Sequence, residues 1–115
     1  MRRKLGDKIR IKHILDAIDE IESYVENKEM ADFFNSSMIR FACIKQLEII
    51  GEACNHISDD IKSNHTHISW EEIISLRNVL VHEYFGVDAT LVWQIIENDV
   101  PNLKAEMERL LNTFS

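Results

Sequence analysis

Apolar residues recur every three to four positions along residues 7–27, and no other feature constrains the fold of this chain more tightly. The stripe comprises Ile11, Ile14, Leu15, Ile18, Ile21 and Val25. This spacing gathers apolar side chains on one face of an α-helix. Residues 36–57, which Asn35 or Ser36 is expected to cap, are apolar on almost every side, as is typical of a central helix. The short polar connection over residues 28–35 predicts that the two helices run antiparallel.

Signals at helix ends predict three shorter helices in the rest of the chain. Ser69 and Glu72 have the spacing of a capping box, in which Ser69 is the cap and the helix starts at Trp70. Asp88 is expected to cap another helix, and Pro101 to separate that helix from the last one, because proline disfavours helix at the residue before it. The first of the three is expected over 70–84 and the last over 101–113. Residues 58–68 are expected to form a polar loop or a short helical turn.

Turn-forming residues are scarce: the 115 residues include three Gly and one Pro. An all-β fold needs such residues in quantity. The length suits one domain, and 45% hydrophobic with 29% charged residues is ordinary for a globular protein. We therefore expect a single all-α domain over residues 1–115, an antiparallel up-and-down helical bundle of about five helices.

The net charge of −7 is unevenly distributed. Residues 1–12 contain one acid, Asp7, and six bases, which are Arg2, Arg3, Lys4, Lys8, Arg10 and Lys12. One interpretation is a solvated N-terminal arm that runs into the first helix, and the other is a local patch that faces phosphates. The overall acidity speaks against non-specific binding of nucleic acid.

Two sequence patterns that are absent, together with the cysteines, indicate the cellular setting. No apolar run approaches the ~18 residues of a membrane span, and no apolar stretch of a signal peptide follows the basic start, so we expect a cytoplasmic protein. Cys43 and Cys54 lie eleven residues apart. On one helix this is about 16 Å along the axis, beyond the reach of a disulfide. Two buried, reduced thiols are expected.

Four hydrogen-bonding residues, Arg77, Asn78, His82 and Tyr84, share one side of the helix expected after Ser69. An Arg guanidinium matches phosphate oxygens, and a His transfers protons near neutral pH. Together they suffice for cleavage of RNA without a metal: His82 takes the proton of a 2′-OH, Arg77 stabilises the charged phosphorane, and Asn78 orients the imidazole. The plain alternative is a surface Arg with a half-buried His.

Other polar and aromatic residues suggest no second site. His56, His65 and His67 lack an acidic or Cys partner at a metal-ligand spacing, so neither a metal nor another cofactor is expected. Trp70 and Trp93 are interpreted as packing anchors. The acid Glu52 (on the central helix) is expected to be buried and satisfied within the bundle.

The segment Arg77-x4-His82-x-Tyr84 resembles the motif of the HepT-like branch of the HEPN superfamily. The resemblance continues through residues 7–9 and 13–18, which are similar to the family's first helix, and residues 47–53, which are similar to its second. It also includes Trp70, Ile73, 86–88, Val92 and Trp93, so that it covers nearly the whole chain.

The resemblance implies a homodimeric helical bundle and a role as the toxin of a type VII (HEPN/minimal nucleotidyltransferase) toxin–antitoxin system. It implies a metal-independent endoribonuclease with Arg77 and His82 as the catalytic pair, Asn78 in support, and Tyr84 as the tyrosine that the nucleotidyltransferase antitoxin adenylylates. This chain has no nucleotidyltransferase signature, so the antitoxin is expected to be a separate chain. Two alternatives stay open: a non-catalytic helical partner or nucleotide-binding subunit of the nucleotidyltransferase, and a dimeric RNA binder without turnover.

Overall fold

The computed structural model describes the backbone of residues 2–82 and 88–114, and the side chains of residues 5–76 and 88–114. Helices make up nearly all of this part of the chain, and no strand occurs in it. The elements are α1 (Arg2–Val25), α2 (Met30–Asn35), α3 (Ser37–Asn55), α4 (Asp59–Asn64), α5 (Trp70–His82), α6 (Ala89–Gln94), the π-helical segment η2 (Ile95–Asp99) and α7 (Val100–Leu111). The all-α prediction is confirmed, and the short helices α2 and α4 add to the five expected.

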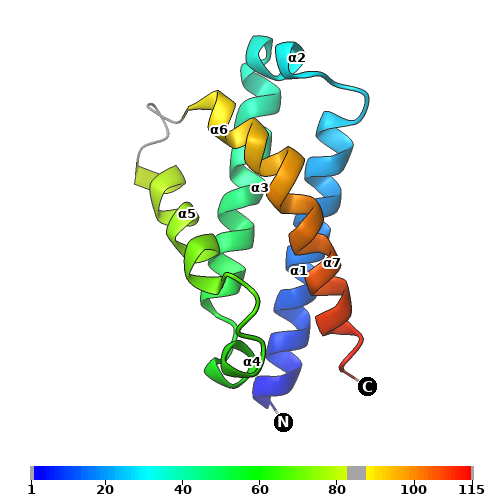
Figure 1. The fold of residues 1–115 in the computed structure, drawn as a ribbon, viewed down its shortest axis with the longest axis vertical. Helices are drawn as coiled ribbons and strands as arrows, with labels where there is room; N and C mark the ends of the chain where they lie inside the picture. The colour runs from blue at the N-terminus through cyan, green and yellow to red at the C-terminus, as the bar shows by residue number, and fades with distance from the viewer. Residues whose placement is uncertain (1, 83–87, 115) are drawn as a thin grey trace.

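The two long helices α1 and α3 pack side by side and run antiparallel, as predicted (Figure 1). Helix α5 packs on α3, while α7 packs on α1. The stripe of α1 forms the centre of the core, because Ile11, Ile14, Ile18 and Ile21 are all fully buried. Across the surface, Lys104 Nζ lies 2.7 Å from Glu22 Oε1 and joins α7 to α1.

Helix α1 begins at Arg2, so the expectation of a solvated N-terminal arm is wrong. The basic stretch forms the first turns of this helix. The reason is Asp7, which is only 3% exposed and accepts two hydrogen bonds from Ser58, at 2.9 Å from its backbone N and at 2.6 Å from its Oγ. Once this point is fixed, the helix extends backward at a cost of about 1 kcal/mol at Gly6 and at little cost through the good helix formers Arg2 to Leu5.

Local caps set the starts of several helices. Ser36 caps α3 by accepting from Ile39 N at 3.2 Å, and Asp88 caps α6 by accepting from Thr90 N at 2.8 Å. Both caps were predicted. At the end of α1 the chain reverses at Asn27, whose φ of 60° lies in the left-handed region that asparagine tolerates.

Helix α2 is missing from the sequence prediction, which has only a polar break there. The helix has six residues, too few to reveal a periodic pattern. Its capping box uses Glu29 and Asp32 rather than Ser or Thr. Its purpose in the fold is to bury Phe33, whose ring lies 5.2 Å from that of Trp93 on α6. Trp93 is therefore the packing anchor that the sequence indicates.

Pro101 does not separate two helices, which corrects the prediction. The path runs from α6 through η2 into α7, and Pro101 lies in the first turn of α7. A proline in a regular helix lacks one N–H donor and clashes with the carbonyl four residues before it. The five residues of η2 form a wider π turn just before the proline, with Val100 N donating to Ile95 O. The wider turn lets the helix continue past the proline.

Cys43 and Cys54 are both buried on α3 and free, as predicted. Burial raises the pKa of Cys43 to about 11 and the pKa of Cys54 to about 12, because the interior disfavours the thiolate. Within the ranges that the structure describes, no helix is both long enough and apolar enough to cross a membrane.

Candidate active site on α5

The start of α5 is fixed by the loop that precedes it. The helix begins at Trp70, as its capping signal predicts, and the side chains of Ile68 and Trp70 are buried. Trp70 Nε1 donates to the carbonyl of His65 at 3.1 Å, and His65 Nδ1 donates to the carbonyl of Ile61 at 3.1 Å. These bonds attach α5 to α4 through the short loop, and they confirm Trp70 as a packing anchor.

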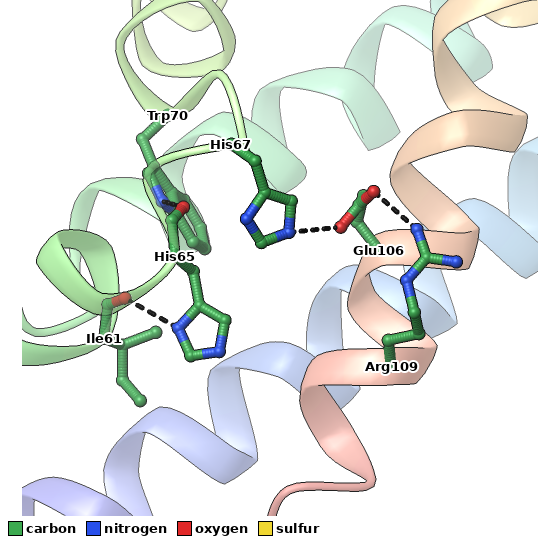
Figure 2. A network of polar contacts seen from close by, with 6 residues as sticks. All are labelled: Ile61, His65, His67, Trp70, Glu106 and Arg109. Carbon is green, nitrogen blue, oxygen red and sulfur yellow. Dashed lines mark hydrogen bonds and ion pairs between the residues drawn. The ribbon is translucent and has the colours of Figure 1, made fainter.

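A second set of contacts attaches the same loop to α7 (Figure 2). His67 Nε2 donates to Glu106 Oε2 at 2.9 Å, because a carboxylate can only accept. Arg109 donates to the other carboxylate oxygen of Glu106. Partial burial raises the pKa of Glu106, but the hydrogen bonds from Arg109 and His67 outweigh burial and hold that pKa below its ordinary value. No sequence signal reveals this contact, because its partners lie 39 residues apart.

His56 and Glu52, both singled out in the sequence, are partners of each other. His56 Nε2 lies 2.8 Å from Oε1 of Glu52 on the same helix. The side chain of Glu52 is 45% exposed, so the expectation that it is buried is wrong. A helix residue four positions away supplies a partner at the surface. The side chains described here contain no cluster of three or more His, Cys, Asp or Glu suited to a metal ion.

The motif residues Arg77, Asn78 and His82 all belong to α5. Their backbone is described, whereas their side chains and the whole of Tyr84 lie outside the described residues. The predicted helix end near Tyr84 lies outside them as well. One uninterrupted helix therefore spans the motif from Arg77 to His82, and Asn78 stands one turn before His82.

The helical register relates the motif to the two sides of α5. Arg77 follows the buried Trp70 by seven residues, or about two turns, so its backbone position lies on the side of α5 that enters the core. His82 follows the exposed Ser75 by the same interval, so its backbone position lies on the outer side. The pair thus spans the boundary between the buried and exposed sides of α5, at the end of the helix remote from its anchored start.

Comparison with known proteins shows which family the chain resembles. The family model described as "Ribonuclease HepT-like" matches residues 14–110. A protein of Methanocaldococcus jannaschii named "Putative RNase MJ1380" is 40% identical over 83% of this chain and 87% of its own length. One of Thermococcus cleftensis named "Probable ribonuclease HepT" is 38% identical over 93% of this chain and 97% of its own.

A longer relative shows that the domain also occurs within larger proteins. The M. jannaschii protein named "Gamma-glutamylcyclotransferase and putative RNase MJ0434" is 38% identical over 90% of this chain, but the match spans only 47% of that relative. No solved structure matches the chain. The family match and the relatives covered over most of their length lead to one conclusion: the chain belongs to the ribonuclease HepT-like family.

Proposed function

We propose that this protein is a metal-independent endoribonuclease and the toxin of a type VII toxin–antitoxin system. The observation that carries the proposal is the motif Arg77-x4-His82 on a single helix, in a chain whose family is named for ribonuclease activity. RNA is the substrate. The chemistry follows from the two residue types and needs no metal ion or cofactor.

Cleavage uses the 2′-OH of the substrate as the nucleophile. His82 accepts the proton of this hydroxyl as its oxygen attacks the neighbouring phosphorus, and the bond from phosphorus to the 5′-oxygen breaks. Arg77 stabilises the negative charge on the phosphorane oxygens, and Asn78 orients the imidazole from one turn away. The products are a 2′,3′-cyclic phosphate and a 5′-hydroxyl, the latter after the 5′-oxygen gains a proton.

A homodimer that places two motifs in one shared cleft is part of the proposal. The support comes from large apolar side chains on the outer side of α3: Met38 is 78% exposed and Phe41 52% exposed, and Ile49 lies on the same side. Monomeric proteins rarely leave such residues grouped in solvent. Met38→Glu combined with Phe41→Glu is expected to give monomers in light scattering, whereas Lys28→Glu, at an exposed residue between α1 and α2 and outside this side of α3, is expected to leave the dimer intact.

Adenylylation of Tyr84 by a separate minimal nucleotidyltransferase is the proposed means of neutralisation. Each added AMP brings a bulky nucleotide and a phosphate charge, which pairs with the guanidinium of Arg77 and occupies the place of the substrate phosphate. Mass spectrometry of the protein coexpressed with its antitoxin is expected to show added AMP on Tyr84. An unmodified Tyr84 in a fully neutralised pair would refute this mechanism of neutralisation.

Cleavage of RNA by the purified, antitoxin-free protein in the presence of EDTA tests the activity. His82→Ala is expected to reduce the rate by about 10²–10⁴-fold, the usual range for a lost proton-transfer group, and Arg77→Ala by about 10²–10³-fold, the usual range for a lost group that stabilises charge in the transition state. Arg109→Ala and His13→Ala remove the same residue types elsewhere and should leave the rate within about twofold. Cleavage that survives either motif substitution would overturn the mechanism, and RNA binding without product would instead favour a non-catalytic binder.

A further inference from the structure

A hollow of about 310 Å³ lies between α3, α5 and the continuous helix formed by η2 and α7. Its inner wall is apolar, and the residues that form it include Leu47, Ile50, Ile73, Leu76, Ile95 and Leu103. Polar residues surround its mouth, where Glu72, Asp99 and Asn102 are exposed. Small-molecule sites have this construction: an apolar cavity of roughly 300–1,000 Å³ with a few polar groups at its edge.

Among the lining residues that the structure describes, the charged side chains at the mouth are all carboxylates. Carboxylates come from three elements, Glu72 on α5, Asp99 on η2 and Glu106 on α7, and no lysine or arginine is among the lining residues described. Glu106 is shared with His67 and Arg109, whereas none of the ion pairs found among the described side chains engages Glu72 or Asp99. The mouth therefore attracts a cation.

A π-helical turn forms one side of the hollow. Ile95 and Asp99, the first and last residues of η2, both line it. Single π turns occur frequently at functional sites, since the wider turn changes the direction of the following side chains. Here the turn supplies both an apolar wall residue and a carboxylate at the mouth. The carboxylate of Asp99 makes no capping hydrogen bond to α7.

We propose that this hollow binds a small organic cation, an amine whose apolar body lies against the leucines and isoleucines while its ammonium group meets Glu72 and Asp99. The apolar wall excludes a fully hydrated metal ion as the preferred ligand, and the carboxylates disfavour anions. The carboxylates invoked here are not residues of the ribonuclease motif, so the inference holds whether or not the chain cleaves RNA.

Phenethylamine, with nine non-hydrogen atoms, is a suitable probe, because 2-phenylethanol and phenylacetate present the same ring with a neutral and an anionic group. For a ligand of nine atoms at an ordinary affinity per atom, a dissociation constant of about 0.5–10 mM is expected. Titration followed by ¹H–¹³C spectra of isoleucine and leucine methyl groups covers this range. The amine should shift Ile73, Ile95 and Leu103, the alcohol should bind several-fold more weakly, and phenylacetate weakest.

Matched variants test which carboxylates bind the ammonium group of the amine. Glu72→Gln and Asp99→Asn should each weaken binding of the amine by about two- to fivefold, as expected for an ion pair at a surface, and should leave binding of the alcohol unchanged. Glu71→Gln and Glu97→Gln neutralise neighbouring carboxylates that do not line the hollow, and should leave binding of the amine within error. Circular dichroism confirms the fold of each variant.

Two results would overturn the proposal. One is equal binding of the amine, the alcohol and phenylacetate, which would show that the carboxylates do not distinguish ligands by their charge. The other is methyl shifts confined to the outer side of α3, at Ile49 rather than at the isoleucines of the hollow.

Discussion

Removal of the Asp7 carboxylate should destabilise the protein far more than removal of any exposed acid. Asp7 is 3% exposed and joins α1 to the first residue before α4 through two hydrogen bonds from Ser58. A buried hydrogen bond to a charged group contributes about 1.5–3 kcal/mol. Relief of the cost of burying the carboxylate offsets part of the loss. Asp7→Ala should therefore lower the free energy of unfolding by about 3 kcal/mol, out of the 5–15 kcal/mol typical of a domain.

Urea denaturation followed by circular dichroism measures this change. With an m-value of about 1–3 kcal/mol/M, the midpoint should fall by about 1–3 M. Asp16→Ala is the matched control, because Asp16 lies on the same helix and is exposed. It should change stability by less than about 0.5 kcal/mol.

A double-mutant cycle with Ser58→Ala isolates one of the two bonds. Ser58→Ala removes the hydroxyl that donates to Asp7 Oδ2 but keeps the backbone N–H that donates to Oδ1. The coupling energy between Asp7→Ala and Ser58→Ala should be about 1.5–3 kcal/mol. A coupling near zero, or equal effects of Asp7→Ala and Asp16→Ala, would refute the conclusion that this contact fixes the start of α1.

Three further substitutions or conditions test the packing. Burial raises the pKa of Cys43 to about 11 and the pKa of Cys54 to about 12, so above pH 9, the ordinary pKa of an exposed thiol, unfolded chains release protons that the folded protein keeps. Stability is therefore complete below pH 9 and should fall by about 2.7 kcal/mol per pH unit between pH 9 and 11, which a pH series of urea curves measures; a flat series contradicts it. Trp70→Phe loses the hydrogen bond to the His65 carbonyl and should cost about 1 kcal/mol, with no change in melting temperature as the opposing result. Phe33→Ala empties a fully buried position and should cost about 3–5 kcal/mol in the same urea assay, and a cost below 1 kcal/mol would mean that α2 is not anchored by this ring.

Helix starts were predictable where the signal is local. Ser36 and Asp88 each bond a backbone N–H two or three residues later, so a short stretch of sequence contains the whole interaction. The start of α1 was mispredicted because the partner of Asp7 is 51 residues away. Pro101 misled for a different reason: proline alone indicates a break, and only the π turn just before it shows how the helix continues.

The candidate site also has a part that the sequence predicts and a part that it does not. The motif residues and their helical spacing can be recognised from the sequence, because Arg77, Asn78 and His82 lie within two turns of one helix. The loop that anchors α5 could not be recognised, since the bond from His67 to Glu106 joins residues 39 positions apart. The hollow beside α5 is likewise assembled from three separate elements.

By itself, the sequence determined the helical class, the antiparallel pair at the centre and the residues of the motif. Periodic apolar spacing and capping involve residues only a few positions apart, so both can be recognised in the sequence. The tertiary structure alone decided that the basic N-terminal stretch is part of a helix tied down by Asp7, and that α6 and α7 form one path around a π turn. It also decided that carboxylates from α5, η2 and α7 meet around an apolar hollow. These features depend on contacts between distant residues, which exist only once the helices have packed.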